Sequence, residues 1–351
     1  MPETPAARIS EAELDSSHVI EVGAGFWPSK TLLSAVELDL FSRLGGVSMS
    51  GKEIGARLAL HPRAIYDLLD ALVALGFLDR DGQETGGRYR NSAEAAAFLD
   101  KQSPSYVGGF LEMCNARFYR FWGDLTEALK TGQPQNEVKL TGTPIFDELY
   151  SDPARLEQFM RALGQGLSLG DFDALTERFD FAGYETVCDV GGATGQLCTT
   201  LAARYSHLRC TTYDLRVVAP IAERSIAAAG LSDRVAVASG DFFADALPRA
   251  DVITMGHILH DWNLDRKKQL ISAAYDALPD GGAFIVIEHI IDDARRANVF
   301  ALMMSLNMLI EFGDAFDFTG GDFAGWCKEV GFKEVDVLPL AGPASAGIAY
   351  R

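Results

Sequence analysis

The chain has 351 residues, 48% of them hydrophobic, and carries a formal net charge of -18. This length predicts two domains, and the negative charge argues against nucleic acid and anionic membranes as partners because it repels phosphate groups. Five cysteines without a C-x-x-C pair, a polar and acidic start at residues 1–17, and apolar runs too short for a membrane span together predict a cytoplasmic protein with reduced thiols.

The first hundred residues combine a helical periodicity with a hairpin pattern. Apolar residues recur at helical spacing over 18–46, Ser50 and Glu53 fit a capping box, and His61 with Pro62 predicts the start of another helix. Residues 77–89 contain an Asp-Gly turn typical of a hairpin. The order predicts a winged helix over residues 1–100, for which the acidic charge favours a role other than DNA binding.

The pattern changes along the rest of the chain. Residues 101–182 are predicted to be mostly helical, forming a linker that also supplies a substrate pocket. From residue 183 strands and helices alternate, which predicts a Rossmann-like α/β domain over 183–351, with an open parallel sheet and helices on both faces. Within this domain, Arg266, Lys267 and Lys268 are interpreted as one solvated helix face. Strands are expected at 185–189, 208–214, 234–239, 250–259 and 283–290, a helical insert at 297–311, a helix near 322–330, and two final strand-like runs.

A glycine-rich loop, DVGGATG at residues 189–195, lies where the first strand of this domain meets a helix. Ligands bind at this end of a parallel sheet, but the spacing differs from a dinucleotide fingerprint because Gln196 occupies the position of the last glycine. Asp214 ends the second strand, where a carboxylate can accept ribose hydroxyls. Asp241, followed by Phe242, ends the third. Each aspartate alone fits a helix cap or turn equally well, but acids on three successive strand ends indicate one site.

These motifs resemble those of class I S-adenosylmethionine-dependent methyltransferases. Nearly the whole chain is similar to small-molecule O-methyltransferases of the caffeate/hydroxyindole type, including bacterial members that act on natural products. The resemblance implies an N-terminal dimerisation domain that forms a homodimer, and S-adenosylmethionine as cofactor. It also implies that this cofactor is held by residues of the loop and of the neighbouring strand ends: Asp189, Gly191, Gly192, Gly195, Asp214, Leu215, Gly240, Asp241, Phe242 and His257.

The sequence ILHDW at residues 258–262 resembles the family's catalytic motif and implies that His260 is the general base. Glu288 matches one of two acids that orient it, and Asp317, one methylene shorter than the usual glutamate, falls at the position of the other. A phenol has a pKa of about 10 and an unperturbed histidine one of about 6.5, so proton transfer is uphill by roughly 5 kcal/mol. Neighbouring carboxylates, including Asp261, raise the pKa of the imidazole and narrow this gap.

The expected reaction is transfer of a methyl group to a hydroxyl of a small aromatic, phenolic or polyketide-like metabolite, without a metal. Two departures from the family pattern are Ala193 in place of a glycine and Gly256 in place of a lysine that often contacts the cofactor. Alternatives are an NAD-dependent oxidoreductase, a winged-helix metabolite-sensing regulator, or the same fold used for C- or N-methylation, decarboxylation or hydroxylation. A flat, uncharged substrate is expected to contact apolar residues: Met113, Phe159, Leu163, Trp262, Met304 and Met308.

Overall fold

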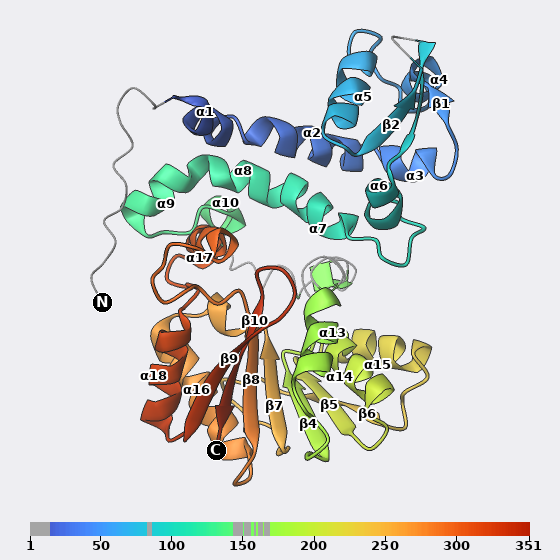
Figure 1. Cartoon of the computed structure of the whole chain (residues 1–351). Coiled ribbons are helices and arrows are strands. Elements are labelled where there is room, and N and C mark those ends of the chain that lie inside the picture. Colours follow the sequence, from blue (N-terminus) through green and yellow to red (C-terminus); the bar gives the residue numbers. More distant parts are fainter. Residues whose placement is uncertain are drawn as a thin grey trace, which may run out of the picture. The chain divides into compact units, whose positions relative to one another are not determined.

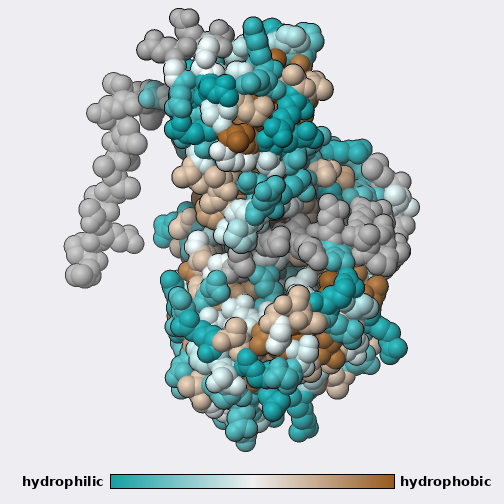
Figure 2. Space-filling view, turned by 90° about the vertical axis from the view of Figure 1, so that its right-hand side faces the viewer, coloured by the Kyte–Doolittle hydropathy of each residue, from teal (hydrophilic) through white to brown (hydrophobic). Residues whose placement is uncertain are grey.

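The structure is a computed structural model that describes residues 15–82, 86–142, 150, 156–157, 159–160, 164 and 169–351. It divides into two compact units, Met1–Asn115 and Ala116–Arg351. Within the described residues, no helix is long and apolar enough to cross a membrane. The face drawn in Figure 2 is largely hydrophilic, and its hydrophobic side chains form small separate groups.

Three helices occupy the region in which the sequence predicted one. They are α1 (Ser17–Gly23), α2 (Phe26–Glu37) and α3 (Leu40–Leu44). The single-helix prediction is wrong because the backbone leaves the helical region at Asp39, which has a φ of 58°. The start of helix α5 (Ile65–Ala74) also differs from the prediction, since Pro62 lies in a turn ahead of it.

The winged helix is confirmed in the first unit. Helix α4 (Gly51–Arg57) begins with the predicted capping box of Ser50 and Glu53. Strands β1 (Met49–Ser50), β2 (Leu78–Asp81) and β3 (Arg88–Asn91) form an antiparallel sheet in the order β1-β3-β2. The helices and the sheet enclose one apolar core around Phe41, Leu69 and Tyr89. Helices α6 (Ala93–Phe98) and α7 (Gly108–Met113) follow the sheet.

A helical segment opens the second unit and is tied to the later helix α17 (Val299–Phe312). The Arg117 guanidinium donates to both oxygens of Glu137, at 2.7 Å each, and to Glu311 at 2.9 Å. Trp122 donates to Asn307 at 2.9 Å. These bonds hold the segment against α17. Its elements are η3 (Cys114–Phe118), α8 (Tyr119–Phe121), η4 (Trp122–Asp124), α9 (Leu125–Thr131) and α10 (Glu137–Thr141).

The second unit is built on a sheet of seven strands in the order β6-β5-β4-β7-β8-β10-β9. The five strands from β6 to β8 in this order are parallel, whereas β10 pairs antiparallel with both β8 and β9. The predicted open parallel sheet is confirmed in these five strands, and the two final strand-like runs form an edge in which β10 is antiparallel because the link between β9 and β10 is too short for a crossover. The strands are β4 (Thr186–Val190), β5 (Arg209–Asp214), β6 (Val235–Ser239), β7 (Val252–Gly256), β8 (Ala283–Glu288), β9 (Glu334–Pro339) and β10 (Ser345–Tyr350).

Helices cover both faces of this sheet, as predicted (Figure 1). Helices α13 (Leu169–Arg178), α14 (Gln196–Arg204) and α15 (Ala219–Ala228) lie on one side, and α16 (Leu264–Ala277) and α18 (Gly320–Val330) lie on the other. An apolar cluster fills the space between the sheet and each helical layer. Every residue of β8 is buried, which is typical of a central strand covered on both faces.

Candidate active site

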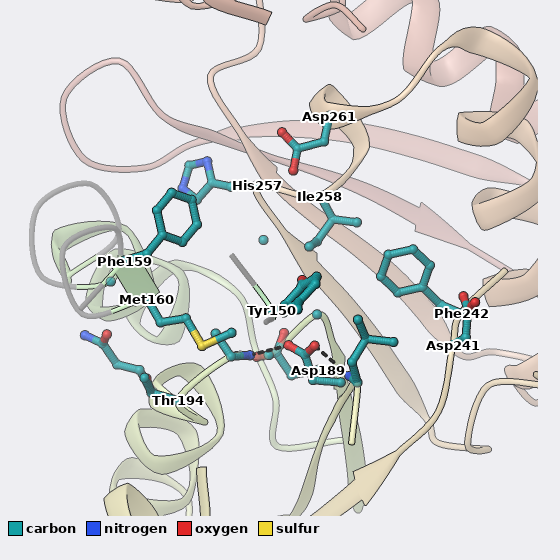
Figure 3. Close-up of a pocket in the computed structure, with 18 of the residues that line it drawn as sticks. Tyr150, Phe159, Met160, Asp189, Thr194, Asp241, Phe242, His257, Ile258 and Asp261 are labelled. Atoms are coloured by element: carbon teal, nitrogen blue, oxygen red, sulfur yellow. Dashed lines mark hydrogen bonds between the residues drawn. The ribbon is translucent and has the colours of Figure 1, made fainter. Parts of the chain in front are cut away.

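A pocket of about 410 Å³ lies at the carboxyl ends of the parallel strands β4, β5 and β7 and beside the turn that follows β6. In Figure 3, His257 and Phe159 lie on one side of it and Asp241 and Phe242 on the opposite side. This is the end of the sheet at which open α/β folds bind ligands. The described lining residues are Tyr150, Phe159, Met160, Gly164, Phe172, Asp189, Gly191, Gly192, Ala193, Thr194, Gln196, Asp214, Leu215, Asp241, Phe242, Phe243, Gly256, His257, Ile258, Asp261 and Trp262.

The glycine loop between β4 and α14 forms the floor of this pocket. Gly191 has a φ of 73°, and a Cβ atom there would lie 2.3 Å from Ile258. A Cβ at Gly192 would lie 2.3 Å from the Thr212 hydroxyl. The left-handed backbone favours glycine at 191, and at 192 a Cβ atom would collide with Thr212 and with the backbone of Asp189. Gly195 does not line the pocket, and with a φ of 75° it caps α14 instead.

Two carboxylates at neighbouring strand ends, Asp189 buried and Asp214 partly buried, lie beside this loop. Asp189 accepts a 2.7 Å hydrogen bond from the Thr254 hydroxyl, and burial raises its pKa to about 7. Asp214 accepts hydrogen bonds from the backbone nitrogens of Ala193, at 3.0 Å, and Leu215, at 2.7 Å. Burial also raises the pKa of Asp214. Both side chains line the pocket, and each oxygen of Asp214 keeps a lone pair beyond its backbone bond.

The turn after β6 contributes an acid and an aromatic wall. Asp241 accepts a 2.8 Å hydrogen bond from the backbone nitrogen of Phe243. The rings of Phe242 and Phe243 both meet the Trp262 ring edge to face, with centroids 6.1 Å and 4.6 Å away. Gly240 does not line the pocket, and a Cβ there would lie 2.1 Å from the Tyr213 hydroxyl. Its lack of a side chain makes room for that tyrosine.

His260 lies on η6 (Leu259–Asp261), a single helical turn after β7, and three carboxylates surround it. Its Nε2 is 3.3 Å from Asp261 Oδ1, and its Nδ1 is 3.6 Å from Glu288 Oε2 and 3.5 Å from Asp317 Oδ1. Burial alone lowers the pKa of His260, but the nearby charges of Glu288, Asp261 and Asp317 outweigh it and raise this pKa to about 10. Burial likewise raises the pKa of Glu288 to about 7 and of Asp261 to about 6.

The four predicted catalytic residues therefore lie together, but only Asp261 lines the pocket. His260, Glu288 and Asp317 are buried immediately beside it, with exposed fractions of 7%, 1% and 2%. The orientation of the Glu288 carboxylate is fixed, because its Oε1 accepts a 2.9 Å hydrogen bond from the backbone nitrogen of Leu259. The imidazole can therefore exchange protons with three carboxylates without exposure to bulk water.

Lys267 contradicts the interpretation of residues 266–268 as a solvated helix face. Its side chain is completely buried, its Nζ donates to the carbonyl oxygen of Trp262, and this nitrogen lies 3.8 Å from the Phe316 ring centroid. Burial lowers the pKa of Lys267 to about 8, against the charges of Glu288 and Asp317, which raise it. Position 267 falls on the inner face of α16, which also carries Leu270 and other buried residues.

Three further ionisable side chains border the cluster. His257 lines the pocket with a left-handed φ of 53°, and its Nδ1 lies 3.9 Å from Glu288 Oε2. Its Nε2 lies 3.9 Å from Asp171 Oδ2, on α13. Burial lowers the pKa of His257 well below its usual value, lowers that of His289 to about 4, and raises that of Asp171 to about 7. Sequence reasoning missed Asp171 and His289, and no motif marks either of them.

Only some of the predicted substrate residues line the pocket. Phe159 and Trp262 line the pocket. Met304 and Met308 lie on α17 and do not line it, and Met308 is buried. Leu163 lies outside the described residues, and Met113 belongs to the first unit, so neither can be placed against the pocket.

A mostly parallel seven-stranded sheet with a glycine loop and acids at successive strand ends defines a class I methyltransferase. Family comparison agrees: an O-methyltransferase domain matches residues 122–333, and an O-methyltransferase dimerisation domain matches residues 20–101. The chain belongs to the S-adenosylmethionine-dependent O-methyltransferase family. The predicted family, fold class and cofactor are confirmed.

Several relatives are similar over almost the whole chain. The tetracenomycin polyketide synthesis 8-O-methyl transferase TcmO of Streptomyces glaucescens is 38% identical, over 95% of this chain and 96% of its own length. The N,N-dimethyltransferase OxyT of Streptomyces rimosus is 34% identical, over 95% of this chain and 94% of its own length. Among solved structures, human N-acetylserotonin methyltransferase in complex with S-adenosylmethionine superposes with a TM-score of 0.87 at 26% identity, over 98% and 99% of the two chains.

Proposed function

We propose that this protein transfers the methyl group of S-adenosylmethionine to a hydroxyl of a small aromatic, polyketide-like metabolite, with His260 as the general base. The observation that carries this proposal is the set of three carboxylates within 3.6 Å of the His260 ring nitrogens, immediately beside the pocket. Two relatives named as O-methyltransferases of polyketide synthesis and of 3-hydroxy-5-methyl-1-naphthoate support the substrate class.

The pocket residues fit the cofactor. Asp214 keeps acceptor capacity for ribose hydroxyls, Asp241 and Phe242 offer an acceptor and an apolar face for an adenine, and Gly191 and Gly192 leave room for close backbone approach. When bound, the cofactor supplies a methyl group activated by a positive sulfur. The protein then has to align the acceptor oxygen and remove its proton.

His260 is suited to that proton removal. A phenol has a pKa of about 10, and the acids around His260 raise the imidazole pKa to about 10. The two groups are then nearly matched, so proton transfer from the acceptor to Nε2 costs little free energy. Glu288 and Asp317 face Nδ1 and stabilise the imidazolium that forms. Asp261 lines the pocket beside Nε2 and marks the side from which the acceptor approaches.

A homodimer through the first unit is part of this proposal. Helix α1 buries none of its residues, and its Val19, Ile20 and Val22 are exposed by 70%, 64% and 67%. Phe26 and Trp27 at the start of α2 are exposed by 54% and 65%. A contiguous apolar row of this kind is typical of a surface that another chain covers. The match of residues 20–101 to a dimerisation domain supports the same assignment.

A screen with methyl-labelled S-adenosylmethionine tests the reaction. The panel should contain matched pairs of naphthol- and anthracene-type acceptors that differ only in carrying a hydroxyl or an amino group. We expect label in the hydroxyl members. Exclusive labelling of the amino members would favour the N-methylation alternative, for which OxyT, named as an N,N-dimethyltransferase, is the precedent. Turnover of neither series, together with undiminished binding of S-adenosylhomocysteine, would contradict the proposed substrate class.

A further inference from the structure

We infer that His257, His260 and Glu288 form a binding site for a zinc-type divalent cation, and that an ion bound there inhibits methyl transfer. One ligand atom from each of the three residues lies within 4.8 Å of the other two. The binding part of this inference follows from the ligand geometry alone. The inhibition part rests on the proposed role of His260 as the general base.

The three ligand atoms converge on one point. Glu288 Oε2 lies 3.6 Å from His260 Nδ1 and 3.9 Å from His257 Nδ1. Two ligands of a tetrahedral zinc ion, each at about 2.0–2.1 Å, are roughly 3.4 Å apart. Each histidine nitrogen therefore needs to approach the carboxylate oxygen by only a few tenths of an ångström. No direct hydrogen bond joins them at the present distances.

Three polar atoms of this cluster have no hydrogen-bond partner among the described residues. His257 Nδ1, His260 Nδ1 and Glu288 Oε2 are all buried without a hydrogen bond. Buried polar atoms without partners are rare and costly, so an array of three that faces one point needs an occupant. A cation that displaces the proton of His260 can bind all three atoms at once, whereas no donor side chain within the described residues bonds to any of them.

The surroundings also orient the ligands. Glu288 Oε1 accepts from the Leu259 backbone nitrogen at 2.9 Å, which fixes the direction of Oε2. The outer nitrogen of each histidine faces a carboxylate: His260 Nε2 lies 3.3 Å from Asp261, and His257 Nε2 lies 3.9 Å from Asp171. A carboxylate behind a ligating histidine is the usual arrangement in metal sites, where it sets the tautomer and strengthens the ligand.

The ligand set selects the class of cation. Two imidazole nitrogens and one carboxylate oxygen suit zinc, cobalt and nickel, whereas magnesium and calcium prefer oxygen ligands only. His257 lines the pocket, so an ion in the pocket has a path to the site. A zinc-type ion here would not assist the reaction as magnesium does in carboxylate clusters. It would replace a proton on the base.

Occupation of the site would disable the base. A neutral imidazole that binds a metal through Nδ1 carries its hydrogen on Nε2. His260 Nε2 then becomes a donor and cannot accept the proton of the substrate hydroxyl. The ion also neutralises Glu288, the carboxylate that contributes most to the raised pKa of His260. Both effects predict inhibition by zinc, and neither predicts activation.

Binding is tested on the full-length protein without substrate. Cobalt(II) added to the purified protein should produce the visible absorption of a tetrahedral site, and zinc should abolish it with a stoichiometry of one ion per chain. Calorimetry should show zinc binding and no magnesium binding. Absence of the cobalt spectrum, with no heat of zinc binding, would overturn the inference even if methylation is observed.

Variants locate the site. Glu288→Gln and His257→Asn should each weaken zinc binding at least about tenfold, the lower range for changes at a metal site. Asparagine is chosen at 257 because it tolerates the left-handed backbone there. His61→Gln, in a turn of the first unit, and Cys114→Ser are the controls and should keep zinc affinity. Unchanged zinc affinity in both ligand variants, or its loss in a control, would place the ion elsewhere and contradict the inference.

Two further measurements separate structure from chemistry. Retained binding of S-adenosylhomocysteine by Glu288→Gln, whose side chain does not line the pocket, shows that the strand ends are still folded. For His257→Asn, an unchanged melting temperature and circular dichroism spectrum show the same. Micromolar zinc should inhibit turnover of the wild type, and a chelator should restore it. Binding of zinc at the mapped ligands without any inhibition would leave the site in place but overturn its proposed effect, and would argue against His260 as the base.

Discussion

Glu288 Oε2 lies 3.6 Å from His260 Nδ1, while Oε1 of the same carboxylate accepts a hydrogen bond from the backbone nitrogen of Leu259. One side chain at the end of β8 thus fixes the helical turn after β7 and places a carboxylate beside the imidazole that this turn carries. The arrangement follows from the sheet, because β7 and β8 are parallel neighbours and end side by side. The same carboxylate therefore sets both the position of His260 and its raised pKa.

Replacement of the base is the first prediction. His260→Ala should lower turnover by about 10²–10⁴, the usual contribution of general-base catalysis. Affinity for S-adenosylhomocysteine, measured by calorimetry, should stay unchanged because His260 does not line the pocket. His61→Ala serves as the matched control, with normal turnover expected. Near-normal turnover of His260→Ala on an acceptor of high pKa would show that another group removes the proton.

The pH dependence of kcat/KM is the second prediction. The base must be deprotonated, and its pKa is raised to about 10, so activity should rise with pH through the alkaline range, well above the usual value near 6.5 for histidine. Glu288→Gln removes the charge that contributes most to this increase, so the rise should move to lower pH. In His260→Ala it should be lost.

The acceptor itself provides the control for that measurement. A phenol of pKa about 10 ionises in the same range and would also produce a rise. Its ionisation does not depend on Glu288, so only titration of an enzyme group shifts in Glu288→Gln. A profile that is identical in the wild type and Glu288→Gln would assign the rise to the substrate and contradict the role of His260.

Cofactor binding gives the third prediction. Asp214→Ala should weaken S-adenosylhomocysteine binding by about 1.5–3 kcal/mol, the range for a hydrogen bond to a charged group. Asp214→Asn keeps an acceptor oxygen, so its affinity for S-adenosylhomocysteine should lie between those of the wild type and Asp214→Ala. Asp233→Ala, an exposed aspartate outside the pocket, is the control. Equal affinity of the wild type and Asp214→Ala in calorimetry would remove Asp214 from the cofactor site.

The oligomeric state is the fourth prediction. Ile20→Glu and Trp27→Glu place charges on the apolar row of α1 and α2 and should raise the dimer dissociation constant at least tenfold, or about 1.4 kcal/mol. Val337→Glu, at a 44% exposed position on β9, is the control and should remain dimeric. Light scattering over a range of micromolar concentrations makes the measurement. A wild-type protein of 38.0 kDa at every concentration would contradict the dimer.

Local sequence patterns determined much of this protein. The capping box of Ser50 and Glu53 formed as predicted because both partners lie within one helical turn. The glycine loop and the acid at the end of β5 lie at the pocket because all parallel strands end at the same edge of the sheet. Such features depend on neighbours in the sequence or on strand order, and both can be inferred from the pattern of residues.

Contacts between distant segments were decided only by the tertiary structure. The burial of Lys267 depends on Trp262 and Phe316, and a run of basic residues gives no sign of it. The approach of Asp171 to His257, and of His257 to Glu288, joins three separate elements. The place of β10 between β8 and β9 likewise emerges only when the sheet edge is assembled. The physical reason is that packing brings these side chains together, and no local periodicity records which distant partner each one meets.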